Sequence, residues 1–324
     1  MLSRRTFLAA AGASTAGLVT GARAGAAPVV AAVRLGPIGV QLFSLPKLLE
    51  KDLDGTLAML SGLGYQEVEL FGPYPFSVPA AQEQWRGMAS MLGFSGSGYF
   101  GRTAAEFRKR LDAHRLTAPS MHVELETLRD RTEQVGEAAH VLGHQYAGLA
   151  AIPEDRRKTL DDYKRMADEI NAIGAKAKPL GFKVLYHNHG YGFTPLEGQI
   201  PTRVVFDRLD PSLVALEMDI FWTVAGGADP VELLDAYPRL YRLMHVKDMS
   251  KISHFARGGD MQDMMSLSSA MTPAGSGVLD LPRVLAHAKN VGVEHFYVEQ
   301  DLAPNPQEQL GASIRYLRGL TLQA

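Results

Sequence analysis

The sequence predicts a single-domain α/β protein with the (β/α)₈ barrel, or TIM-barrel, fold. Short runs of Val, Leu, Ile and Tyr, typical of buried parallel strands, alternate with amphipathic stretches of helical length. Eight such strand–helix pairs are what a closed barrel requires. An open doubly wound sheet usually carries a glycine-rich phosphate loop after its first strand, and the segment 40–46 contains no glycine. The barrel is therefore the better prediction.

Each element can be placed along the chain from these patterns. The expected strands are Ile38–Phe43, Glu67–Phe71, Ala118–Val123, Gln145–Ala151, Phe182–His187, Val214–Asp219, Leu240–Val246 and His295–Glu299. The expected helices are Asp54–Leu63, Ala104–His114, Arg129–Leu142, Thr159–Leu180, Thr202–Leu209, Pro230–Ala236, Leu281–Val291 and Pro306–Leu320. Two long loops, Gly72–Arg102 and Met249–Val278, follow strands and should lie at the carboxyl-end face, where barrel active sites are found.

The first long loop is rich in aromatic residues, namely Tyr74, Phe76, Trp85, Tyr99 and Phe100. These rings could pack against the apolar face of a sugar, or they could form a small cluster beneath the loop. The sequence favours neither interpretation. The second long loop contains His254, Arg257 and a group of methionines at 261, 264 and 265, followed by Gly275-Ser276-Gly277.

The N-terminus, residues 1–27, is predicted to be a twin-arginine export signal. Arg4-Arg5 precedes a weakly apolar Ala/Gly/Leu stretch that ends in small residues. The stretch is too short and too rich in glycine to span a bilayer, which takes about 20 apolar residues. We therefore expect no stable membrane anchor, and a barrel domain of residues 28–324 that is exported already folded to the periplasm.

The composition narrows the class of function. Removal of residues 1–27 deletes three arginines and no acid, so the formal net charge changes from −2 to −5. A mildly acidic protein lacks the basic surface that nucleic acids require. The chain contains no cysteine, which excludes disulfides and a lipoprotein anchor.

Four strands of the predicted barrel end in polar clusters, and these clusters should converge at the carboxyl edge. The segments read KVLYHNHG (183–190), VALEMDIFW (214–222), YRLMHVKD (241–248) and HFYVEQD (295–301). They bring His187, Asp219, His245 and Glu299 together. Two imidazoles and two carboxylates are a suitable ligand set for one divalent metal ion. Of the neighbouring pair at 187 and 189, His187 is the better ligand because it lies deeper, and His189 is expected to contact substrate.

Further candidates surround this set. Glu299 has a carboxylate that can take a proton from a carbon beside a carbonyl, and Lys247 can hold a substrate oxygen on which negative charge develops. Glu217 should lie lower in the barrel than Asp219. Earlier strands add Gln41, Glu69 and His122 as candidate substrate contacts, each of which could instead be a satisfied interior polar group.

These motifs resemble those of the xylose isomerase-like barrel superfamily, in its branch of sugar phosphate isomerases and epimerases. The resemblance covers the whole predicted domain and is carried by six segments: Gly39–Leu42, Gly64–Gly72, Ala118–His122, Tyr186–His189, His245–Asp248 and Tyr297–Asp301. It implies one divalent ion, such as Mn, Mg, Co or Zn, held by residues of strands five to eight. The first ligand position falls on His187, where many relatives have glutamate. Trp222, a candidate substrate contact, stands where some relatives have histidine.

The resemblance implies an enzyme that abstracts a proton next to a sugar carbonyl, with the metal as Lewis acid and His187, Lys247 and Glu299 as catalytic groups. An isomerase or epimerase is the first expectation. A periplasmic 3-keto-glycoside lyase or hydrolase, which uses the same enolisation followed by β-elimination, is the alternative. A non-catalytic periplasmic sugar-binding protein is an alternative of another class. The expected partner is a small carbohydrate, and the sequence leaves open whether the chain forms a homo-oligomer.

Overall fold

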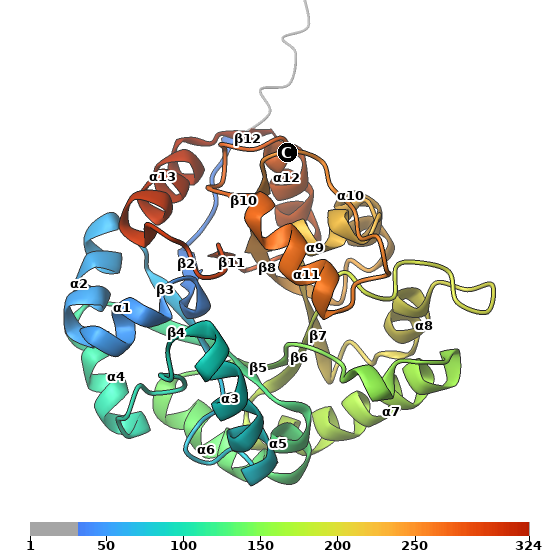
Figure 1. Ribbon diagram of the computed structural model, residues 1–324, viewed down its shortest axis with the longest axis horizontal. Coiled ribbons are helices and arrows are strands. Elements are labelled where there is room, and N and C mark those ends of the chain that lie inside the picture. Colours follow the sequence, from blue (N-terminus) through green and yellow to red (C-terminus); the bar gives the residue numbers. More distant parts are fainter. Residues whose placement is uncertain (1–31, 324) are drawn as a thin grey trace, which may run out of the picture. The chain divides into compact units, whose positions relative to one another are not determined.

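Eight parallel strands close into a barrel with helices around it (Figure 1). The computed structural model describes residues 32–323, so the export signal predicted for residues 1–27 lies outside the described part of the chain. The strands follow one another around the barrel in chain order, and the last one, β11, pairs with the first, β2. The predicted fold class is confirmed.

The barrel strands begin and end close to the predicted positions. They are β2 (Ile38–Gln41), β3 (Glu67–Phe71), β4 (Thr117–Val123), β5 (Tyr146–Leu149), β6 (Lys183–His187), β7 (Val214–Asp219), β8 (Tyr241–Val246) and β11 (His295–Val298). Apart from the first residue of β4 and of β6 and Arg242 in β8, all their residues are buried. The continuous apolar runs therefore reflect burial on both faces of the sheet.

All eight predicted helices are present, with small differences at their ends. They are α2 (Leu53–Leu63), α4 (Ala104–Ala113), α6 (Thr132–Leu142), α7 (Leu160–Ala177), α8 (Pro201–Arg208), α10 (Pro230–Ala236), α12 (Leu281–Val291) and α13 (Pro306–Gly319). The start predicted for α6 was wrong, because Arg131 leaves the helical conformation and separates α6 from a short helix, α5 (Leu125–Asp130). The helix predicted over 159–180 ends as a 3-10 turn, η3 (Lys178–Leu180).

Four further helices and four short strands were not predicted. The helices are α1 (Pro46–Lys51), α3 (Pro79–Leu92), α9 (Ile220–Ala225) and α11 (Met261–Leu267). The strands pair as β1 (Ala32–Val33) with β12 (Leu322–Gln323), and as β9 (Asp248–Met249) with β10 (Met271–Thr272). Both long loops thus contain regular structure, since α3 lies in the first and α11 in the second. None of the helices in the described part of the chain is long and apolar enough to cross a membrane.

The aromatic residues of the first long loop pack inward. Tyr74, Trp85 and Tyr99 are buried, and the Trp85 ring lies 5.8 Å from Phe71 and 5.7 Å from Phe94. The indole Nε1 of Trp85 donates to the Ser95 carbonyl at 2.9 Å. Of the two interpretations left open by the sequence, the cluster beneath the loop is the one that the structure supports.

One irregularity in the sheet matters for the site. Between β7 and β8 the register shifts, so that Leu216 pairs with Tyr241 while Glu217 pairs with Leu243. One extra residue of β8 is accommodated there. The shift places Asp219 directly beside His245.

Candidate active site

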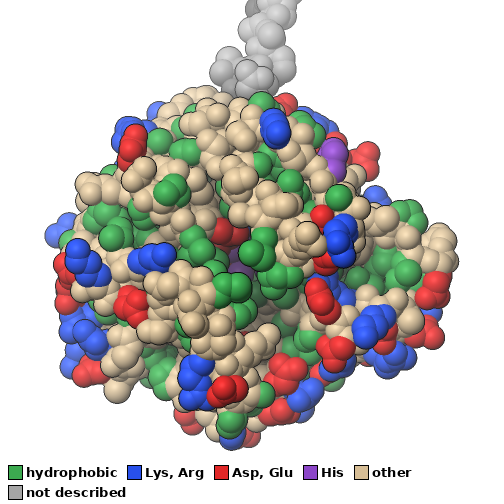
Figure 2. Space-filling view, viewed as in Figure 1, with side chains coloured by type: hydrophobic (Ala, Val, Ile, Leu, Met, Phe, Trp, Pro, Cys, Tyr) green, Lys and Arg blue, Asp and Glu red, His purple; other side chains and the backbone are tan. Residues whose placement is uncertain are grey.

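A cluster of ionisable side chains lies at the carboxyl ends of the barrel strands. Figure 2 shows this face, with acidic and histidine side chains visible at the centre of a hollow that hydrophobic side chains surround. The cluster consists of Glu69, His122, His187, Glu217, Asp219, His245, Lys247, Glu299 and Asp301. All are buried except Asp301, whose side chain is 21% exposed.

The upper part of the cluster contains three of the four predicted metal ligands. Asp219, His245 and Glu299 each offer a ligand atom, and these atoms lie within 4.8 Å of one another. Glu299 Oε2 is 2.7 Å from His245 Nδ1, and Asp219 Oδ2 is 3.9 Å from the same nitrogen. Three side chains from three adjacent strands therefore present donors to one point.

The lower part of the cluster lies deeper in the barrel and contains the fourth predicted ligand. His187, His122, His245 and Glu217 form a second group with ligand atoms within 4.8 Å. Glu217 Oε2 accepts from His122 Nε2 at 2.8 Å and from His187 Nδ1 at 3.1 Å. The other nitrogen of His187, Nε2, is 3.9 Å from Asp219 Oδ2, so His187 connects the lower group to the upper one.

His245 joins the two groups because both of its ring nitrogens contact carboxylates. Nδ1 faces Glu299, and Nε2 lies 2.6 Å from Glu69 Oε2 and 3.3 Å from Glu217 Oε2. Burial opposes a charge on this ring, but the carboxylates of Glu217, Glu299 and Glu69 outweigh it and raise the pKa of His245 well above its ordinary value. Glu69 and Glu217 thus hold the ring with Nδ1 directed at the upper group, as outer carboxylates do for metal-binding histidines.

Lys247 lies among three carboxylates of the upper part. Its Nζ is 2.7 Å from Glu299 Oε2, 3.0 Å from Asp219 Oδ2 and 2.9 Å from Asp301 Oδ1. Burial opposes the ammonium charge, yet these carboxylates raise the pKa of Lys247 well above its ordinary value. Lys247 is therefore a buried cation held by three carboxylates.

The charges of the cluster do not balance. Five carboxylates face three groups that favour their protonated forms, namely Lys247, His245 and His122. Burial opposes a charge on His122, but Glu69 and Glu217 raise its pKa. With every carboxylate ionised, two negative charges remain unmatched in a buried site, which is costly. Burial also raises the pKa of Asp219 despite the nearby Lys247 and His245. A metal ion bound at Nδ1 of His245 would also release the proton of that ring, so the site offers at least as much negative charge as a divalent cation carries.

The donor chemistry fits such an ion as well. Carboxylate oxygen and imidazole nitrogen suit Mn, Co and Zn. Within residues 32–323, the second carboxylate oxygen, Oε1, of Glu69 and of Glu217 is buried and has no hydrogen-bond partner. The cluster can therefore hold a metal ion, and the residues placed to ligate it are Asp219, His245 and Glu299, with His187 beside them.

The predicted substrate contacts occupy different surroundings. Gln41 is buried, donates to Glu69 Oε2 at 2.8 Å and accepts from Phe43 N at 3.1 Å, so both ends of its amide are used inside the fold. His189 is partly exposed and donates from Nδ1 to the Ala150 carbonyl at 2.6 Å. Burial and then Lys247 lower its pKa to about 3, which leaves Nε2 as an acceptor. Glu69 and His122 belong to the lower part of the cluster.

Trp222 lies beside the upper part of the cluster, at the start of α9. Its ring stacks on Phe255 at 5.7 Å, and its centroid is 5.6 Å from Lys247 Nζ. The indole Nε1 is buried and has no hydrogen-bond partner among the described residues. An indole beside the buried cation offers an apolar wall and one free donor to a ligand.

Sequence reasoning gave no role to three residues that hold the site together. Asp301 contacts Lys247. Asn188 accepts from the Asp219 backbone N–H at 3.3 Å and donates to Thr223 at 3.1 Å. Asp248 accepts from four backbone N–H groups at 2.8–3.2 Å and so fixes the second long loop, the donors being Met249, Gly275, Gly277 and Leu279. Two of them, Asp248 and Asp301, could have been found, because they end the polar segments HVKD (245–248) and EQD (299–301).

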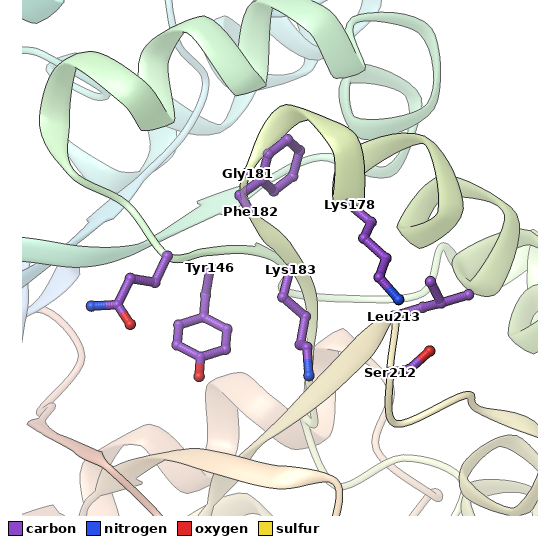
Figure 3. A pocket seen from close by; sticks show the side chains of 8 residues that line it. Tyr146, Lys178, Gly181, Phe182, Lys183, Ser212 and Leu213 are labelled. Atoms are coloured by element: carbon purple, nitrogen blue, oxygen red, sulfur yellow. The ribbon is translucent and has the colours of Figure 1, made fainter.

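A hollow of about 450 Å³ lies at the opposite, amino-terminal end of the barrel (Figure 3). It is lined by Gln145, Tyr146, Lys178, Gly181, Phe182, Lys183, Ser212 and Leu213. Lys183 Nζ donates to the Pro211 carbonyl at 2.9 Å and carries no ion pair within the described residues. Barrel enzymes place their chemistry at the carboxyl end, so this hollow is not the active site.

A closed parallel barrel with carboxylates and imidazoles converging at its carboxyl edge places its polar cluster where barrel enzymes have their active sites. The family model described as "xylose isomerase-like TIM barrel" matches residues 57–320 of this chain. The chain therefore belongs to the xylose isomerase-like TIM-barrel family.

Several curated relatives are inosose dehydratases from Bacillus species. The enzyme of Bacillus cereus strain AH820 is 27% identical over 176 residues, which cover 51% of this chain and 58% of that protein. That match thus spans less than two thirds of the relative. The inosose dehydratase of Bacillus anthracis strain CDC 684 is 26% identical over 258 residues, which cover 70% of this chain and 85% of that protein.

Solved structures show the same fold. A sugar phosphate isomerase/epimerase from Parabacteroides distasonis superposes with a TM-score of 0.68 at 23% identity, covering 89% of this chain and 95% of that one. The IolI protein, whose structure contains a zinc atom, has a TM-score of 0.60 at 14% identity, covering 87% and 95%. These neighbours support the architecture of the barrel.

Proposed function

We propose that the protein is a divalent-metal-dependent enzyme that removes a proton from the carbon beside the carbonyl of a keto-sugar or keto-cyclitol, followed by β-elimination. The observation that carries this proposal is the convergence of Asp219, His245, Glu299 and Lys247 at one point of the carboxyl edge. A general base next to buried cations is the arrangement that enolisation needs. The relatives named inosose dehydratase support elimination as the outcome.

The metal would be held by Asp219, His245 and Glu299, with His187 as the fourth ligand. When bound, the ion supplies a Lewis acid that polarises the substrate carbonyl. The unmatched negative charge of the cluster supports this assignment, as does the zinc atom in the structure of the IolI protein.

The side chains of this chain divide the remaining work. The contacts of Glu299 with His245 and Lys247 both use Oε2, so Oε1 is left to accept the α-proton. Lys247 brings a positive charge to the oxygen on which the enolate develops. The neutral His189 offers its Nε2 to a substrate hydroxyl, and the indole of Trp222 forms an apolar wall.

Isomerisation or epimerisation is the second candidate, because it begins with the same proton abstraction. Epimerisation by paired glutamates needs one acid–base group on each side of the substrate carbon. The residue opposite Glu299 in that scheme is His187, and burial followed by the neighbouring His245 lowers its pKa well below the ordinary value. A neutral, buried imidazole bonded to Glu217 is a poor proton donor, which favours elimination over epimerisation.

The test uses purified protein loaded with Mn, Co or Zn and incubated in D₂O with a keto-inositol or a 3-keto-glycoside. We expect NMR to show loss of water or aglycone, with deuterium at the α-carbon of any substrate that is reprotonated before it eliminates. Glu299→Gln should lower the rate at least about 100-fold, the usual contribution of a general base. Glu294→Gln serves as the matched control, because it changes an exposed glutamate that immediately precedes β11, whereas Glu299 immediately follows this strand. Exchange without elimination supports the isomerase, and the absence of both exchange and elimination on both substrate classes would overturn the proposal.

We also propose export by the twin-arginine route, on the basis of Arg4-Arg5 and the stretch that follows. Replacing both arginines by lysine should leave the precursor in the cytoplasm, as cell fractionation would show. The proposal of twin-arginine export is contradicted if the lysine variant still reaches the periplasm in a strain in which no other route exports folded proteins.

A further inference from the structure

Lys247 and the candidate metal site use the same oxygen atoms. Asp219 Oδ2 and Glu299 Oε2 converge with His245 Nδ1, and each of these oxygens also contacts Lys247 Nζ, at 3.0 and 2.7 Å. Metal–oxygen bonds to carboxylates measure about 2.0–2.2 Å for zinc. An ion bound to both oxygens would thus lie next to an ammonium group that contacts the same pair. Two positive charges so close together would repel each other.

We propose that Lys247 is an internal counter-ion that occupies the Asp219–Glu299 pair when no divalent ion is bound, and that metal loading displaces its ammonium group. This inference rests on the proposed function, since it concerns the same metal. It assigns the Lys247 ammonium group two positions. In one it occupies the carboxylates that would bind the metal, and in the other it leaves them free.

The second position is provided by groups that are not expected to ligate the metal. Asp301 Oδ1 is 2.9 Å from Nζ, and its side chain keeps 21% exposure, so it lies on the outer side of the cluster. The face of Trp222 is 5.6 Å from the ammonium group and can retain it by a cation–π contact. An ammonium group that leaves Asp219 and Glu299 therefore keeps a carboxylate and an aromatic face, and it moves towards the mouth where substrate enters.

The competition should weaken metal binding, because the apparent dissociation constant is divided by the fraction of molecules with an open site. Replacing Lys247 by methionine removes the competitor and preserves most of the side-chain volume. We expect Lys247→Met to bind Mn at least about tenfold more tightly than the parent, within the usual range of coupling between sites. In the absence of metal the same variant should unfold at a lower temperature, because three carboxylates, two of them buried, lose their counter-ion.

Lys183→Met is the matched control, since it removes one lysine from a barrel strand at the other end of the molecule (Figure 3). Its affinity for Mn should equal that of the parent. Lys247→Gln is the second variant in case methionine prevents folding, because a neutral amide can still donate to one carboxylate. All four proteins are stripped with chelator and titrated with MnCl₂ by calorimetry.

Crystal structures of the parent, stripped and soaked in MnCl₂, distinguish displacement from simple electrostatic repulsion. We expect Nζ to leave Asp219 and Glu299 in the metal-bound crystal and to remain on Asp301. The inference is overturned if Mn binds at these carboxylates while Nζ stays within about 3 Å of both, a hydrogen-bond distance, or if Lys247 variants that fold bind Mn no more tightly than the parent. Failure of the parent and of every variant to bind Mn, Co or Zn would overturn the proposed function instead.

Discussion

Asp219 has two structural roles, and they can be separated by substitution. Its Oδ1 accepts from the Trp222 backbone N–H at 2.9 Å and caps helix α9, while its Oδ2 faces Lys247, His245 and His187. Asp219→Asn keeps an oxygen for the cap and removes the charge. Asp219→Ala removes both. The pair of variants therefore distinguishes a helix cap from a metal ligand.

The structure sets the expected magnitudes. Loss of the cap costs about 1 kcal/mol, so Asp219→Ala should melt about 2 °C below Asp219→Asn in a chain of this size. Burial raises the pKa of Asp219, which means that its charge is unfavourable in the metal-free protein. Asp219→Asn should accordingly be at least as stable as the parent without metal. With metal at 1,000 times its dissociation constant, the parent should gain about 4 kcal/mol, and neither variant should gain.

Differential scanning calorimetry, with chelator and then with MnCl₂ or ZnCl₂, measures all three differences. Asp229→Asn, which also changes a helix-capping aspartate but lies at the start of α10, is the control and should keep the full metal response. The reasoning is refuted if Asp219→Asn gains as much stability from metal as the parent. The assignment of Asp219 as the cap of helix α9 is refuted if the alanine and asparagine variants have the same melting temperature.

Three further outcomes follow from the fold. Gly39→Ala should destabilise the barrel by about 1–3 kcal/mol in urea denaturation, because its Cβ would lie 2.3 Å from the Tyr297 ring; an unchanged midpoint would contradict this. Burial lowers the pKa of His144 to about 4. The contribution of the neutral imidazole to the free energy of unfolding is therefore complete above pH 6.5 and is lost as the pH falls towards 4. His144→Asn should therefore show a smaller drop in melting temperature between pH 7 and 5, and an identical drop would exclude the histidine as a cause. Asp248→Ala should cost at least about 2 kcal/mol and expose the segment 275–279 to proteolysis, and a protease-resistant variant would show that the loop is held by other contacts.

The barrel strands could be predicted because burial on both faces leaves continuous apolar runs in the sequence. The helix α3 could not be predicted in the same way, because it lies in a segment punctuated by Pro73, Pro75 and Pro79, which reads as a loop. Here Pro79 occupies the first position of the helix, where its missing N–H costs nothing. The boundary between α5 and α6 depends on the non-helical backbone conformation of the single residue Arg131, which leaves no mark in the pattern of residue types.

The site shows a similar division. The positions of Asp219, His245 and Glu299 at strand ends follow from the alternation of strand and helix. Which of their atoms meet depends on the register, and the shift near Arg242 that aligns Asp219 with His245 has no signature in the sequence. Lys247 was expected in the site from its place at a strand end, but its contacts with three carboxylates were not, because they depend on how the fold brings these groups together.

The lower part of the cluster explains why this barrel tolerates a costly interior. Glu69 and Glu217 are fully buried, and replacing buried ionic groups by apolar residues of similar volume is often neutral or stabilising. Their presence is therefore poorly explained by stability. Both accept from His245 or His122, and together they direct Nδ1 of His245 towards Asp219 and Glu299. The two glutamates thus fix the donor at the carboxyl edge, and a single substitution of either should weaken metal binding and also lower the melting temperature, because it leaves a buried histidine without its partner.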